Sequence, residues 1–237
     1  SYSPKLRLSC SQVLWYNLNT KIEQQIGSCR KGEMMSEKVN DTIALFISKL
    51  SEATGYQYLK SRKSLKKTIG QIVFEVLFFS SKWNDDNNIE INADFRVSYK
   101  KYGAASTAYS VVASKSFENN KEYWYDISNE SKFDEILKYF ETELQTTAVD
   151  LSDRFDKDFK AACQYLLEEK FKEYNVFFDF LVDVLGEEKV MYRINEFTEQ
   201  LSESDKQQIA DYKKGAKDKT WMLNRSNMRF VVDNGYL

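Results

Sequence analysis

The densest group of chemically active side chains in this 237-residue chain is a basic segment at residues 60–67, which reads KSRKSLKK. Its five cations are Lys60, Arg62, Lys63, Lys66 and Lys67. Cations at this density could contact the phosphates of a nucleic acid or the acidic surface of a partner protein. Tyr56 and Tyr58 precede the segment and could stack on bases. A solvated edge strand or hairpin is the structural alternative, because lysines there block pairing with another sheet.

The chain contains no histidine, and this absence removes several classes of enzyme. Histidine is the usual general base near neutral pH and the commonest metal ligand. Ser-His-Asp and Cys-His catalysis are therefore excluded, as are the mixed Cys/His zinc sites and the 2-His-1-carboxylate iron site. A carboxylate-only metal site and a Lys/Glu acid–base pair stay open.

The acidic residues do not form a recognisable catalytic pattern. Asp85 and Asp86 followed by Glu90 have only a superficial likeness to a metal-dependent nuclease, which commonly needs a lysine two residues after the strand carboxylate; here that position is Asn92. The acidic run at 150–158 lacks the central glycine and terminal glutamate of a calcium loop, so charge at a helix N-terminus explains it better. The chain has no GxxxxGK[ST], GxGxxG or GxSxG motif. We expect no cofactor and, on balance, no enzyme, with a carboxylate-metal phosphoesterase as an alternative.

Composition indicates a globular cytoplasmic protein. The chain is 42% hydrophobic and 30% charged, and its net charge is −2, which gives no global attraction to nucleic acid or to anionic membrane. No apolar stretch approaches the roughly 20 residues that span a bilayer, and the N-terminus does not read as a signal peptide, so we expect no membrane partner. Cys10, Cys29 and Cys163 fit no metal or redox motif and are typical of free thiols in a reducing cytosol. The abundance of Lys, Asn and Tyr is compatible with a bacterial or phage source.

The elements that would position the basic segment begin with two amphipathic helices. Apolar residues recur at helical spacing from Ser11 to Gly27. A second helix should be capped by Ser36 and end at Gly55, with one apolar stripe made of Val39, Ile43, Phe46, Ile47 and Leu50. Met34 or Met35 could be the native start, and residues 1–33 would then be an upstream extension.

An antiparallel meander of four to five strands should follow. We expect strands at residues 69–80, 89–99, 108–114 and 123–127. Residues 89–99 alternate strictly, so one face would be apolar and the other would carry Glu90, Asn92, Asp94, Arg96 and Ser98. Burying those charges unpaired would be costly. We therefore expect that polar face to be exposed to solvent or to line a groove, with the basic segment beside it.

Helical periodicity returns after Ser128. It predicts helices near residues 133–144, 159–171, 176–185, 190–201 and 204–214. The tail is ambiguous, because residues 229–232 could pair as a strand. The expected fold class is α+β: N-terminal helices, a four- to five-stranded antiparallel meander, then a C-terminal helical block. The expected organisation is an extension or helix at 1–34, an α+β domain at 35–128 and a helical region at 129–237, packed on or beside it.

Three successive passages of the sequence resemble a known group of proteins: GYQYLKSRKSLKK, IVFEVLFFSSKWN and IEINADFRVSY. They are similar to small uncharacterised bacterial proteins of unknown function that are often considered in connection with toxin immunity. The resemblance covers about residues 36–130 and has no catalytic signature. It implies an α+β binding protein and does not identify the partner.

We therefore expect a non-enzymatic protein that binds another macromolecule, in an immunity-like or phage-defence role. The partner should be a protein, with nucleic-acid binding through residues 60–67 as an alternative. The expected contact residues are Lys60, Arg62, Lys63, Lys66, Lys67 and Arg96. Reversing the charges of Arg62, Lys63 and Arg96 together should weaken partner binding without unfolding the domain.

Overall fold

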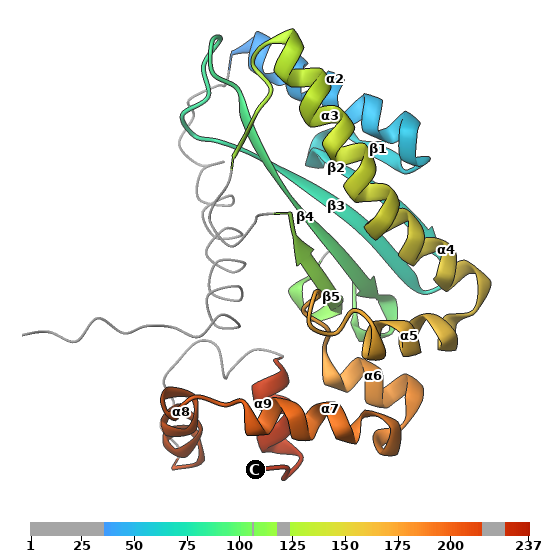
Figure 1. Cartoon of the computed structure of the whole chain (residues 1–237), viewed down its shortest axis with the longest axis vertical. Helices are drawn as coiled ribbons and strands as arrows, with labels where there is room; N and C mark the ends of the chain where they lie inside the picture. Colours follow the sequence, from blue (N-terminus) through green and yellow to red (C-terminus); the bar gives the residue numbers. More distant parts are fainter. Residues whose placement is uncertain (1–35, 106, 118–123, 215–225) are drawn as a thin grey trace, which may run out of the picture. The chain divides into compact units, whose positions relative to one another are not determined.

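The structure is a computed structural model that describes residues 36–105, 107–117, 124–214 and 226–237. Figure 1 shows an α+β architecture in which a helix precedes an antiparallel sheet and further helices follow it, which confirms the predicted fold class. The chain divides into two compact units, each described by itself below. The described residues of one lie within Met35–Val190, and those of the other are residues 191–214 and 226–237. The predicted helix at residues 11–27 lies outside the described residues.

Helix α2, Glu37–Thr54, begins and ends where its local sequence predicts. The Ser36 hydroxyl accepts a hydrogen bond from the Val39 amide at 3.2 Å, which satisfies a donor that the first turn leaves without a helical partner. Gly55 ends the helix with φ 69°, a left-handed conformation that is strained for residues with a Cβ atom. The five predicted stripe residues are all buried.

The described strands form one six-stranded antiparallel sheet in the order β1-β2-β3-β4-β5, with β6 also paired to β4. Their bounds are β1 Gln57–Leu59, β2 Ser64–Ile69, β3 Ile72–Ser80, β4 Glu90–Tyr99, β5 Val111–Ser116 and β6 Tyr125–Asp126. Short 3-10 turns occupy Lys60–Arg62 (η1), Lys100–Tyr102 (η2) and Ala108–Ser110 (η3). Most of the predicted strand at 69–80 is β3, while Ile69 ends β2 and a tight turn at Gly70 joins the two strands; the predicted strand at 108–114 begins with a 3-10 turn.

One face of the sheet is an aromatic core covered by helices, because alternate residues of β3 and β4 point the same way. Phe74, Val76 and Phe78 of β3 are buried on this face. The Phe46 ring of α2 lies 6.3 Å from that of Phe78, and the Phe155 ring lies 5.5 Å from that of Phe74. Figure 1 shows α2 and α3 running across the same side of the sheet.

The helices that follow the sheet are α3 Glu130–Leu144, α4 Asp150–Lys157, α5 Phe159–Glu168 and α6 Phe178–Leu185. A π-helical turn, Gln145–Val149, joins α3 to α4. Asp158 caps α5 through bonds from the Lys160 and Ala161 amides, and Asp150 and Asp153 lie in the first turn of α4. The acidic run at 150–158 therefore supplies helix N-terminal charge, as predicted.

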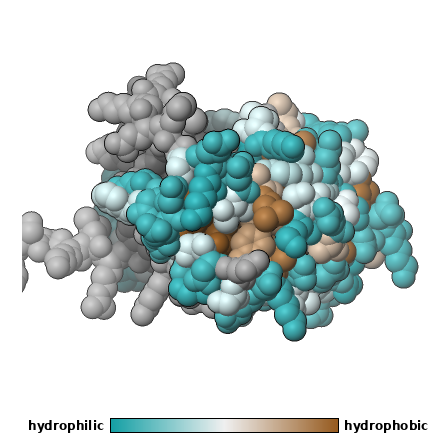
Figure 2. Space-filling view, turned by 90° about the horizontal axis from the view of Figure 1, so that it is seen from above, coloured by the Kyte–Doolittle hydropathy of each residue, from teal (hydrophilic) through white to brown (hydrophobic). Residues whose placement is uncertain are grey.

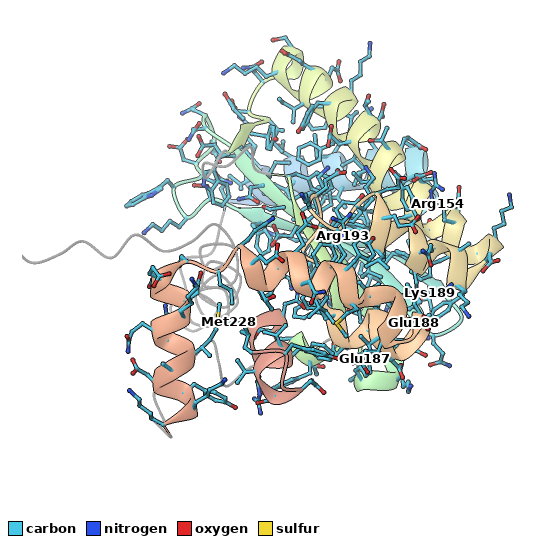
Figure 3. All side chains as sticks on the ribbon, turned by 60° about the horizontal axis from the view of Figure 1, so that its bottom comes forward. Arg154, Glu187, Glu188, Lys189, Arg193 and Met228 are labelled. Atoms are coloured by element: carbon cyan, nitrogen blue, oxygen red, sulfur yellow. The ribbon has the colours of Figure 1, made fainter. Side chains whose placement is uncertain are left out.

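The remaining helices are α7 Glu187–Glu199, α8 Glu203–Lys213 and α9 Asn227–Asp233. Within Met191–Leu237, Leu201, Ile209 and Met228 form a small core against which Phe197, Tyr212 and Val232 pack. Figure 3 labels Met228 on α9 and shows Glu187, Glu188 and Lys189 at the start of α7. The strand considered for residues 229–232 is wrong, because Ser226 caps a helix there by accepting the Arg229 amide. Among the described helices, none is both long and apolar enough to cross a membrane.

Candidate functional site

The predicted basic segment folds as η1 followed by β2. Lys63 joins them with φ 47°, the one described non-glycine residue with positive φ, and its carbonyl accepts the Phe78 amide at 3.0 Å. β2 pairs with β1 on one side and β3 on the other, so it is not an edge strand, but the segment does form the turn and second strand of a β1–β2 hairpin, which was the other structural alternative. β3 also separates the segment from β4, so the expectation that the segment lies beside β4 is wrong.

The cations of the segment point to both sides of the sheet, since successive strand residues face opposite ways. Lys67 pairs in register with Phe74 and so lies on the helix-covered face. Its ammonium is 3.0 Å from the Ser152 hydroxyl and 2.9 Å from an Asp153 carboxylate oxygen, which ties β2 to α4. Lys67 is therefore directed at the protein's own helix.

On the opposite face, four charged side chains alternate in sign across η1, β3 and β4. The Glu75 carboxylate receives the Arg62 guanidinium at 3.2 Å and the Ser64 hydroxyl at 3.0 Å. Arg96 stands opposite Glu75 in the β3–β4 register, and its guanidinium lies 3.4 Å from an Asp94 oxygen. We call Arg62, Glu75, Arg96 and Asp94 the charge ladder.

Burial dominates the electrostatics of the charge ladder. The side chains of Glu75, Arg96 and Asp94 are 8%, 12% and 4% exposed. Burial lowers the pKa of the Arg96 guanidinium, while Asp94 and Glu75 act in the opposite direction. The ordinary pKa of arginine is so high that the group stays charged near neutral pH. The ladder thus places ions of both signs next to one another in a site with little water.

The expected exposure of the polar β4 face is wrong for most of its residues. Asn92, Asp94 and Ser98 are 0%, 3% and 5% exposed, while Glu90 and Arg96 are intermediate. Our expectation assumed unpaired ions, whose desolvation is costly. Paired ions recover much of that cost through their mutual attraction and hydrogen bonds. The Arg62–Glu75 and Arg96–Asp94 contacts supply this pairing.

The structure therefore separates the six predicted contact residues. Arg62, Lys66 and Arg96 share one sheet face, with Lys66 in register with Glu75, and Lys67 points to the other face. Lys63 reaches α2, where its ammonium is 3.3 Å from the Asn40 amide oxygen. Lys60 is exposed on η1. Lys60 and Lys63 remain the best candidates for contact with a partner.

The β3–β4 loop contains a functional candidate that lies outside the predicted contact set. Trp83 is 74% exposed, the highest value among the exposed large hydrophobic side chains of the described residues. The Lys82 ammonium lies 4.8 Å from the centre of its ring, within the range of a cation–π contact. The sequence signal for this candidate is the position of a tryptophan inside the polar stretch SKWNDDNN, because a polar turn has no core in which an indole could be buried.

Helix α2 brings this loop and η1 to the same end of the sheet. At its N-terminus the Ser36 hydroxyl donates to the Asp86 carboxylate and the Lys38 ammonium donates to the Asp86 carbonyl. One turn later Asn40 receives Lys63. We call Lys60, Lys63, Lys82 and Trp83 the sheet-end surface. Seen from above in Figure 2, the described part of the molecule is largely hydrophilic, with a small hydrophobic patch near the middle of the view and further hydrophobic atoms toward its right side.

The described residues offer little for catalysis. No group of three or more His, Cys, Asp or Glu side chains among them is arranged to hold a metal ion. Cys163 of α5 is fully buried, and burial raises the pKa of its thiol to about 12, which disfavours the nucleophilic thiolate. The carboxylates of the charge ladder are paired with arginines. The phosphoesterase alternative therefore gains no support from this part of the chain.

Comparison of the chain with protein-family models, with curated proteins and with solved structures found no match.

Proposed function

We propose that the protein binds another protein and that the sheet-end surface is part of the interface. Its cations and its indole are held by a sheet and a helix that are anchored to each other. Rigid presentation of this kind lowers the entropy lost on association. The proposal takes a non-enzymatic binding role, with an immunity-like or phage-defence function in a bacterial cytoplasm as its most specific form.

One observation favours a protein partner over a nucleic acid. Carboxylates of the chain itself already pair with cations of the predicted contact set: Glu75 with Arg62, Asp153 with Lys67 and Asp94 with Arg96. A polyanion gains affinity from each cation that is available to its phosphates, and these three are engaged. The result is a surface of mixed charge, which suits a partner with complementary charges of both signs.

The charge reversal of Arg62, Lys63 and Arg96 is not a clean test of this function. Reversing Arg96 would place three carboxylates together on a buried face, and loss of folding would follow. Lys60 and Lys63 can be reversed instead, because Lys60 is exposed on η1 and the Lys63 ammonium lies 3.3 Å from a neutral group, the Asn40 amide oxygen.

The test uses the full chain with Lys60→Glu and Lys63→Glu, beside a control with Lys49→Glu and Lys138→Glu, two exposed lysines on α2 and α3. A partner captured by the wild-type protein from its native host is purified, and its Kd for each variant is measured at low and moderate salt. We expect the sheet-end variant to bind about 10-fold more weakly, mainly through a slower association rate, and the control to bind normally. Equal affinities for both variants would place the interface elsewhere, and recovery of small metabolites alone would contradict a macromolecular partner.

A further inference from the structure

We propose that Trp83 is the anchor of this interface and inserts into an apolar pocket of the partner protein whose rim carries a carboxylate. This inference rests on the proposed function, which it deepens by stating the chemistry of the partner. It could fail while the proposed function holds, because other residues of the sheet-end surface could make the contact.

The exposure of Trp83 is the first reason. Tryptophan has the largest apolar area of any side chain, and the β3–β4 loop leaves three quarters of it in water. Residues that dominate protein–protein affinity are enriched in tryptophan and lie where a partner can surround them. A loop with only a connecting role would gain nothing from an exposed indole.

The rigidity of the loop is the second reason, since the Ser81, Asn84 and Asp85 side chains hydrogen-bond to its backbone. Ser81 accepts the Trp83 amide at 3.2 Å, and the Asn84 side chain spans the loop by donating to the Glu90 carbonyl at 2.9 Å and accepting the Glu90 amide at 2.8 Å. Asp85 accepts the amides of Asn87 and Asn88 at 2.8 and 3.0 Å. The backbone that carries Trp83 is therefore already ordered before a partner arrives, which reduces the entropy lost on binding.

The charges around the indole indicate the character of the partner's pocket. The carboxylates of Asp85 and Asp86 are directed at the loop amides and at Ser36, within the protein. Lys82, by contrast, has no ion pair with any described residue, and its ammonium covers the indole ring. A pocket that receives the ring must also receive this ammonium, and a carboxylate at its rim would pair with it.

A protein pocket fits these features better than the bases of a nucleic acid. Base stacking needs an indole face open to the base, together with cations along the strand. Here Lys82 lies over one face of the ring, and the two aspartates that follow would lie close to phosphates of the same sign, which disfavours a strand that approaches the other face.

The experiment places a photo-crosslinking benzoylphenylalanine at residue 83 or at residue 109 of the full chain in its native host. Tyr109 is the matched control, because it is 59% exposed and lies far from the β3–β4 loop. It is on η3, which leads into Val111 of β5, and Val111 pairs with Ser98 near the other end of β4. The protein joined at residue 83 is identified and purified. Its Kd is then measured for the wild-type chain and for Trp83→Ala, Trp83→Phe, Lys82→Gln and Tyr109→Ala. A mixed-sequence single-stranded oligonucleotide is titrated in parallel.

We expect crosslinking from residue 83 and not from residue 109. Trp83→Ala should weaken binding by about 30-fold or more, with a smaller loss for Trp83→Phe and none for Tyr109→Ala. Lys82→Gln should weaken binding several-fold and reduce its salt dependence. If Trp83→Ala binds the captured partner as tightly as wild type while Lys60→Glu/Lys63→Glu does not, the anchor is refuted and the proposed function stands. Saturable oligonucleotide binding that quenches Trp83 fluorescence would refute the protein pocket, and the absence of any partner would refute both proposals.

Discussion

Neutralising Glu75 should destabilise the sheet, because this carboxylate is the central member of the charge ladder. The Glu75→Gln change keeps the volume of the side chain and one acceptor oxygen. It removes the negative charge that faces Arg62 at 3.2 Å and stands in register with Arg96. It also places the new amide NH2 group opposite a hydrogen-bond donor, because the Arg62 guanidinium contacts both carboxylate oxygens and the Ser64 hydroxyl donates to one of them.

The expected magnitude follows from the burial of each partner. Hydrogen bonds to charged groups contribute about 1.5–3 kcal/mol each, and removing one partner of a fully buried ion pair costs about 3–5 kcal/mol. Arg62 is 40% exposed, so water solvates its guanidinium once the Glu75 charge is removed. The contribution of the Arg62–Glu75 ion pair to the loss of stability must be reduced accordingly. Arg96 is only 12% exposed and keeps Asp94. We expect Glu75→Gln to lower the free energy of unfolding by about 2–3 kcal/mol and Arg62→Ala to lower it by about 1 kcal/mol.

Hydrogen exchange of the β3 and β4 amides is the appropriate assay, because a global melt of a chain with two compact units does not isolate the sheet. A double-mutant cycle of Glu75→Gln and Arg62→Ala should give a coupling energy of about 1 kcal/mol. Glu52→Gln, an exposed glutamate of α2, serves as the control. A loss below about 0.5 kcal/mol for Glu75→Gln, or a cycle without coupling, would refute the argument that the ladder stabilises this face.

Two further predictions concern titratable groups on the helical side of the sheet. Burial raises the pKa of Glu173, but the hydrogen bonds from Lys115 and Lys170 outweigh it, so the pKa lies below its ordinary value. The ionised Glu173 therefore stabilises the fold above the ordinary carboxyl pKa, and this stabilisation is lost as the pH falls through the lowered pKa of the folded state. Glu173→Gln should flatten the acid limb of a plot of stability against pH. An unchanged acid limb would contradict this prediction. The Cys163 thiol, with its pKa raised to about 12, should react with a thiol reagent at mildly alkaline pH only as fast as the protein opens. The measurement uses a Cys10→Ser/Cys29→Ser background, and rapid labelling of the native chain would show that the thiol is accessible.

The parts of the fold that depend on neighbouring residues could be predicted from the sequence. The α2 stripe repeats at helical spacing, and Ser36 and Gly55 act on backbone groups within a few residues. The glycine after α6 is another local signal, since Gly186 ends that helix with φ 88°. Segregation of strands and helices along the chain was enough to define the α+β class.

The candidate site could not be predicted in the same way, because it depends on register and on contacts distant in sequence. Alternation alone separates the two faces of β4 but does not say that Glu75 of another strand stands opposite Arg96. The five cations of residues 60–67 form one group in the sequence. In the structure a left-handed residue at Lys63 and the pleat of β2 separate them, so that Lys63 reaches α2, Lys67 reaches α4 and Arg62 reaches Glu75. Trp83 was missed because its polar neighbours indicate a turn and periodicity says nothing about exposure.

The charge ladder and the sheet-end surface are physically linked, and this link separates two kinds of variant. Arg62 belongs to the ladder, and the residue after it, Lys63, holds both the Phe78 amide and Asn40 of α2. A variant that breaks the ladder from within, such as Glu75→Gln, releases η1 from β3 and so disturbs the position of Lys60 and Lys63. Its effect on partner binding should therefore follow its effect on sheet stability. Variants at Lys60, Lys82 or Trp83 act on side chains that form no ion pair with a described residue, and they should change affinity while the exchange of β3 and β4 amides stays as in the wild type.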